Sequence, residues 1–226
     1  MPEGLKEWSH NGLVLPFVIA AVAIQGAVPP GDVQNVVVAT LLAVILVGSF
    51  RAARAKPALR VVAVVFGVAA IAVAVLRALG VAIGEGEARL MSAAVAALAP
   101  PAVALGVIRN LRERGRVGVD AVAGVITLYM LLGMMWAFVY GAIAELSGEF
   151  FAQDVTATVS RCLYFSFTTL TTVGYGDYTA KTDLGHTLAV FEALLGQIYL
   201  VTVVSLIVGN LGRARPNRLA PGKEPL

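Results

Sequence analysis

The chain has 226 residues, of which 58% are hydrophobic and only 14% are charged. A soluble core of this size could not hide so much apolar surface, so the composition excludes an ordinary soluble domain and indicates a membrane protein with several spans. A net charge of +3 is too small to indicate a nucleic-acid partner, and the single cysteine, Cys162, excludes a disulfide within the chain.

The chain begins with a polar lead, residues 1–12, which we expect to be cytosolic. A short apolar segment follows at residues 13–28 and contains Pro16 and Gln25. This segment is either a first membrane helix or a signal peptide. A signal peptide requires a positively charged start, which the lead does not provide, so the pattern favours a retained helix.

Three longer apolar segments come next, at residues 33–50, 59–81 and 89–108. Each reaches or approaches the length that crosses the hydrocarbon of a membrane. Pro100 and Pro101 are expected to interrupt the last of them, because proline removes a helical hydrogen bond. With the first apolar segment, these predict a domain of four transmembrane helices at residues 13–108.

The second half of the chain contains two further spans, at residues 119–145 and 184–211. Between them, residues 158–171 are too short to cross a membrane and predict a re-entrant helix of about 20 Å. Most of the 17 basic residues fall on one side if the N-terminus is cytosolic. The excess of positive charge at cytosolic loops therefore predicts that both termini are cytosolic and that the re-entrant segment opens to the outside.

The stretch from Thr171 to Asp177 cannot be helical, since it places two glycines among hydroxyl, aromatic and carboxylate side chains. Gly174 and Gly176 accept positive φ without steric cost, so the backbone can present a row of carbonyl oxygens. Thr172 adds its hydroxyl below this row. One strand makes only one wall, and a hard cation requires oxygen ligands on all sides, so several chains must meet around it.

The run Thr172-Val173-Gly174-Tyr175-Gly176 resembles the selectivity filter of the tetrameric potassium channels, and the resemblance covers about residues 120–211. It implies that four chains coordinate dehydrated potassium ions through Thr172, Val173, Gly174 and Tyr175. Thr171 would stand at the cavity entrance and Asp177 at the outer mouth. The side chains of Val173 and Tyr175 would point away from the ions and brace the strand.

Three further residues are expected to support the filter or the gate. Glu192 is a costly carboxylate in an apolar helix, so we expect it behind the filter, protonated or touching the hydroxyl of Thr168 or Ser166. Thr168 occupies the position where some potassium channels have a glutamate paired with the filter aspartate. Gly196 matches the position of a gating glycine, and close helix packing is an equally good interpretation.

The resemblance extends to a six-helix, voltage-gated architecture, but the fourth segment lacks a ladder of arginines. Only Arg89 precedes its two prolines. We therefore expect little intrinsic voltage dependence. The predicted units are a lead (1–12), a four-helix domain that resembles a voltage sensor without gating charges (13–108), a basic cytosolic linker (109–118), a pore domain (119–212) and a short cytosolic tail (213–226).

The sequence thus predicts an all-α membrane protein of six transmembrane helices, with a re-entrant pore helix and an extended filter between helices five and six. The expected function is passive conduction of potassium across the plasma membrane by a homotetramer in contact with lipids. We expect no enzyme activity, no nucleic-acid partner and no cofactor besides the permeant ion. Two alternatives stay open: a weakly selective cation channel, and a silent or regulatory membrane subunit that requires a partner.

Overall fold

The structure is a computed structural model that describes residues 14–29, 31–114 and 119–211. These residues form helices and contain no strand beyond a single bridge between Phe151 and Ala180, so the prediction of an all-α protein is confirmed. The helices in chain order are α1 (Leu15–Ala27), α2 (Asp32–Ala52), α3 (Pro57–Ala78), α4 (Glu85–Arg114), α5 (Val119–Ser147), α6 (Val159–Leu170) and α7 (Asp183–Leu211). The predicted lead, at 1–12, and tail, at 213–226, lie outside the described residues.

Five helices, α2, α3, α4, α5 and α7, are long and apolar enough to cross a membrane. Helix α1 has only 13 residues, or about 20 Å at 1.5 Å per residue. It is shorter than the hydrocarbon thickness of about 30 Å. The expected six full spans are therefore five spans and one short apolar helix, which begins at Leu15 with Pro16 in its first turn.

The expected interruption of the fourth span was wrong, because α4 continues through Pro100 and Pro101. A membrane helix can keep proline in its interior when neighbouring helices hold it in place. The surrounding turns of α4 are packed in this way: Val95, Ala96 and Ala99 are buried in the hydrophobic core. The helix also reaches Arg114, so the first part of the predicted linker at 109–118 is helical.

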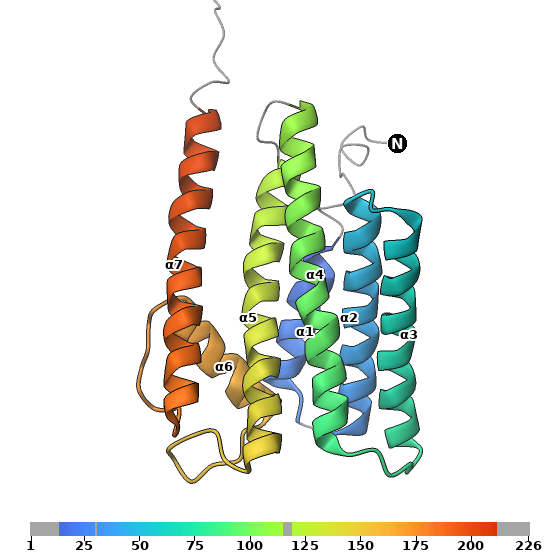
Figure 1. The fold of residues 1–226 in the computed structure, drawn as a ribbon, viewed down its shortest axis with the longest axis vertical. Helices are drawn as coiled ribbons and strands as arrows, with labels where there is room; N and C mark the ends of the chain where they lie inside the picture. Colours follow the sequence, from blue (N-terminus) through green and yellow to red (C-terminus); the bar gives the residue numbers. More distant parts are fainter. Residues whose placement is uncertain (1–13, 30, 115–118, 212–226) are drawn as a thin grey trace, which may run out of the picture.

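The helices form an elongated bundle in which α4 lies between α2 and α5 (Figure 1). Helix α1 packs against α2, α5 and α6, whereas α7 contacts α5 and α6. Through α1 and α4, the unit of the first four helices therefore packs on the second half of its own chain. Helix α6 begins at the end of the bundle where α5 ends, and the following loop returns to that same end before α7 starts (Figure 1).

Candidate ion-conducting site

Helix α6 places the loop that carries the filter motif. Thr158 caps its first turn, since the Thr158 side chain accepts a hydrogen bond from the backbone nitrogen of Arg161 at 3.3 Å. The helix ends at Leu170, close to the predicted end at 171. Its buried face carries Cys162, Phe165 and Ser166, and this face orients the helix toward α5 and α7.

The last four carbonyls of α6, which a helix leaves without internal partners, all accept hydrogen bonds. The amide of Thr171 donates to Phe167 and that of Thr172 donates to Thr169, at 3.0 and 2.9 Å. The hydroxyl of Tyr129 donates to the carbonyl of Leu170 at 3.1 Å. The Thr168 carbonyl accepts two amides, from Val173 at 2.8 Å and from Gly174 at 3.1 Å. The start of the filter motif is thus tied directly to the helix before it.

The backbone of the motif alternates between ordinary and left-handed conformations. Gly174 and Gly176 have φ of 52° and 79°, as their lack of a side chain allows. Thr172 also has a positive φ, of 58°, which the sequence did not predict. A left-handed threonine costs about 1–2 kcal/mol. The hydrogen bonds to Thr168 and Thr169 on both sides of this residue hold it there.

The side chain of Thr172 makes a contact that the sequence did not indicate. Gln197 of α7 donates a hydrogen bond from Nε2 to the Thr172 hydroxyl oxygen at 3.0 Å. A hydroxyl oxygen has two lone pairs, so one stays available to a cation. The hydroxyl of Thr171 instead donates to the Phe167 carbonyl at 2.6 Å.

Tyr164 of α6 supports the outer part of the motif. Its ring stacks on that of Tyr175, with centroids 6.2 Å apart and planes inclined by 13°. It also meets the ring of Tyr178 edge to face at 5.8 Å. Tyr175 was expected to brace the strand, and Tyr164 is the residue it rests on within this chain.

Glu192 of α7 is completely buried between α5 and α6. One carboxylate oxygen lies 2.5 Å from the Tyr140 hydroxyl, and the other lies 2.5 Å from the Ser166 hydroxyl. The Ser166 oxygen is also 2.7 Å from the Gly133 carbonyl. The expected contact with Ser166 is present. The alternative contact with Thr168 is not, since the Thr168 hydroxyl donates to the Phe165 carbonyl at 3.0 Å.

Gly196 lies where α7 crosses the end of α6. A Cβ atom added at Gly196 would lie 2.2 Å from the carbonyl oxygen of Leu170, far inside van der Waals contact. On α5, a Cβ at Gly133 would lie 2.8 Å from the ring of Phe167. The sequence left hinge and close packing equally open for Gly196. The contact distance supports close packing, and the gating role stays a prediction.

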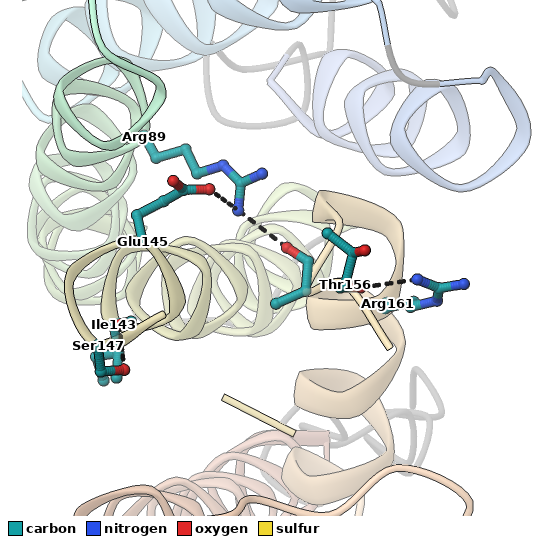
Figure 2. A network of polar contacts seen from close by, with 7 residues as sticks. Arg89, Ile143, Glu145, Ser147, Thr156 and Arg161 are labelled. Carbon is teal, nitrogen blue, oxygen red and sulfur yellow. Dashed lines mark hydrogen bonds and ion pairs between the residues drawn. The ribbon is translucent and has the colours of Figure 1, made fainter. Parts of the chain in front are cut away.

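A second polar network connects α4 and α5 to the segment before α6 (Figure 2). Arg89 of α4 forms an ion pair with Glu145 of α5 at 3.1 Å. The same guanidinium nitrogen donates to the carbonyl of Ala157 at 2.9 Å. Arg161 donates to the neighbouring carbonyl of Thr156 at 2.8 Å (Figure 2). Two arginines thus hold successive carbonyls at the entry to α6.

The sequence did not single out Tyr129, Gly133 and Tyr140, which complete the site. Small residues in membrane helices often mark close packing, so Gly133 carried a usable signal. The two tyrosines carried none, because the partner of each lies at least 41 residues away in another element.

The fold and these contacts define a helical membrane protein. Comparison with known proteins goes further: residues 124–212 match the ion channel family. A rat (Rattus norvegicus) protein, voltage-gated potassium channel regulatory subunit KCNF1, is 28% identical over 90 residues, which is 40% of this chain and 18% of that protein. The probable potassium channel protein 2 of Methanocaldococcus jannaschii is 51% identical over 45 residues, 20% of this chain and 13% of that protein.

Residues 124–212 are therefore similar to the ion channel family, and potassium channel proteins are among the relatives of this part of the chain. The aligned part spans less than a fifth of the length of either relative. No solved structure matches the chain significantly.

Proposed function

We propose that this protein is a potassium-selective channel that conducts ions passively as a homotetramer. Four copies of residues 172–175 would surround a common axis and replace the water around each potassium ion with carbonyl oxygens and the Thr172 hydroxyl. The observation that carries the proposal is the alternating backbone at Thr172, Gly174 and Gly176, fixed to the end of α6 by hydrogen bonds. Such a backbone is what a carbonyl-lined filter requires.

The exposed surface of the single chain supports assembly around that axis. Val173 and Tyr175 are 51% and 71% exposed in the single chain. Their backbone is not helical, and such backbone at membrane depth requires protein or a water-filled cavity around it. One side of α7 is uncovered as well and carries Val190, Phe191 and Leu194. Neighbouring copies would cover the loop and part of this helix, and lipid would cover the rest.

We place the protein in the plasma membrane with both termini in the cytosol, from the distribution of basic residues. Little voltage dependence is proposed, because α4 has no basic residue between Arg89 and Arg109. Arg109 donates to the carbonyls of Ala53 and Arg54 at the far end of the bundle. We assign no enzyme activity, no nucleic-acid partner and no cofactor other than the permeant ion.

The first experiment is a reversal potential of the purified protein in a planar bilayer, with potassium on one side and sodium on the other. We expect a potential near the potassium equilibrium value. Gly174→Ala should abolish selectivity, since alanine is strained by about 1–2 kcal/mol at positive φ. Gly148→Ala is the matched control, because Gly148 also has positive φ (84°) and open space around it but lies outside the motif.

Equal permeation of both ions would identify a weakly selective cation channel. A second candidate function has a specific observation in its favour, because the rat relative is named as a regulatory subunit. A chain that forms no tetramer in native mass spectrometry, and carries no current alone, would identify a silent subunit that requires a partner.

A further inference from the structure

Helix α7 passes close to the start of the filter motif. Figure 1 shows α6 between α5 and α7, and α6 contacts both of them. Gly196 of α7 permits the approach, since an added Cβ there would lie 2.2 Å from the carbonyl oxygen of Leu170, the last residue of α6. The next residue, Gln197, reaches further along the chain and donates a hydrogen bond to the Thr172 hydroxyl oxygen at 3.0 Å. A residue without a side chain thus brings a polar one to the filter motif.

The position of Gln197 is fixed by contacts on both sides of it along α7. Earlier in the helix, a Glu192 carboxylate oxygen lies 2.5 Å from the Ser166 hydroxyl of α6. Shortly after Gln197, the Tyr199 hydroxyl donates to the carbonyl of Val125 of α5 at 2.5 Å. These contacts fix the register of α7 against α5 and α6. A side chain on such a fixed helix positions another group more precisely than a side chain on a loop does.

The hydrogen bond from Gln197 restricts the direction of the Thr172 hydroxyl. Because the amide nitrogen donates to the hydroxyl oxygen, the hydroxyl hydrogen must point away from that nitrogen, and one lone pair stays available to a cation. The neighbouring Thr171 shows a different arrangement, since its hydroxyl donates back to the Phe167 carbonyl at 2.6 Å. Threonine hydroxyls readily turn toward nearby backbone in this way. The donor from α7 favours the arrangement in which the Thr172 oxygen accepts.

We propose that Gln197 is a positioning residue for the potassium site at Thr172. It holds the Thr172 hydroxyl with its free lone pair toward the common axis, and it acts on the ion through this hydroxyl. Four hydroxyls held in advance need no reordering when a potassium ion arrives, so binding costs less. A hydroxyl free to turn could also follow the smaller sodium ion, and discrimination between the two ions would fall. This role rests on the proposed function, because the site requires the tetramer.

The same hydrogen bond could instead serve only to hold α7 against the loop. Removal of such a structural contact would lower the melting temperature equally in any salt. A positioning role has a further signature, because only a potassium site depends on potassium. Potassium that binds the folded protein raises its melting temperature as the concentration rises, and this dependence gives an apparent affinity. The salt dependence of a Gln197 variant therefore separates the two roles.

The first test measures thermal unfolding of the purified full-length chain in nanodiscs against KCl concentration, with choline chloride to keep the ionic strength constant. We expect Gln197→Leu to weaken the apparent potassium affinity about three- to tenfold, as the loss of one hydrogen bond would. Gln153→Leu is the matched control, because the Gln153 amide also donates to a threonine hydroxyl, that of Thr179, at 3.2 Å but outside the filter motif. It should leave the potassium affinity unchanged.

A double-mutant cycle tests whether Gln197 acts through the Thr172 hydroxyl. Thr172→Val removes the hydroxyl, so Gln197→Leu should weaken potassium binding no further in this background, whereas Thr172→Ser keeps the hydroxyl and should retain the full effect. Gln197→Asn is a second variant, since it keeps the amide but is one methylene shorter, and it should also weaken binding. Additive effects of Gln197→Leu and Thr172→Val would overturn the proposal, as would a wild-type potassium affinity in Gln197→Leu.

Reversal potentials in planar bilayers give a second measurement. Gln197→Leu should raise the permeability of sodium relative to potassium about three- to tenfold, and Gln153→Leu should not change it. A wild type that selects potassium, together with unchanged selectivity and potassium affinity in Gln197→Leu, would overturn this role and keep the proposed function. A wild type with neither selective current nor stabilisation by potassium would overturn both.

Discussion

At the scale of single residues, the carboxyl group of Glu192 raises a question of proton count. Three short contacts join Glu192, Tyr140, Ser166 and the Gly133 carbonyl. Each contact needs one proton, and the two hydroxyls supply two. A neutral Glu192 supplies the third, and the network is then complete without a buried charge.

This count makes a prediction. Glu192→Gln keeps one donor and one acceptor, so we expect selectivity to be retained and the free energy of unfolding to change by less than about 1 kcal/mol. Glu192→Asp is too short to reach both hydroxyls and should cost about 1–3 kcal/mol, with faster loss of current during sustained opening. Thermal unfolding and bilayer recordings measure the two effects. If Glu192→Gln lowered the free energy of unfolding more than Glu192→Asp does, the result would show that the carboxylate is charged.

Gly196 gives a second prediction at this scale. A methyl group there would overlap the Leu170 carbonyl, so Gly196→Ala must push α7 away from α6 and should cost about 1–3 kcal/mol. Gly26→Ala is the control, because Gly26 is also helical and has open space around it. It should be neutral or stabilise by up to about 1 kcal/mol. Equal stability of the two variants would remove the packing role assigned to Gly196.

At the scale of elements, Arg89 connects α4 and α5 to the entry of α6. Arg89→Gln removes the ion pair with Glu145 and leaves the Ala157 carbonyl without this donor. Because these groups are partly buried, we expect the free energy of unfolding to fall by about 1–3 kcal/mol and the open probability to change. Arg161→Gln is matched, since Arg161 holds the adjacent Thr156 carbonyl at an exposed position. Arg161→Gln should lower the free energy of unfolding by less than about 1 kcal/mol. Equal losses for the two variants would show that burial does not distinguish the two contacts.

The elements themselves were largely predictable from the sequence. A short helix was expected at 158–171 and is present at Val159–Leu170, because its short length and hydroxyl cap are local features. Its re-entrant path through the membrane stays a prediction. The continuity of α4 through Pro100 was not predictable, since it depends on packing by other helices. The same distinction holds for the site. The glycines of the filter motif predict the positive φ of their own positions, whereas Tyr140 and Tyr129 contact partners that only the fold brings near.

At the scale of the whole molecule, α1 and α4 pack the four-helix unit on the second half of its own chain. In a tetramer this arrangement can be tested by cross-linking. A Cβ at Gly86 would lie 3.4 Å from the Cβ of Glu145, close to the separation in a disulfide. Gly86→Cys with Glu145→Cys, in a Cys162→Ser background, should therefore lose thiol labelling on oxidation without any increase in mass on a gel.

A ladder of dimers to tetramers would show instead that these helices pack on a neighbouring subunit. Ala43→Cys with Gly67→Cys is the control for oxidation, because the two residues face each other across consecutive helices of one chain, α2 and α3. Its products should stay monomeric in either arrangement.

The four satisfied carbonyls at the end of α6 have an electrostatic consequence. Phe167, Thr168, Thr169 and Leu170 already accept hydrogen bonds, so their oxygens are directed at protein donors and are poor candidates for direct ion ligands. The aligned peptide dipoles of the helix remain, and they place about half a negative elementary charge at this end. In the proposed channel, helix and loop would therefore have separate tasks: α6 would lower the electrostatic potential around a cation from a distance, and only the loop after it would touch the ion.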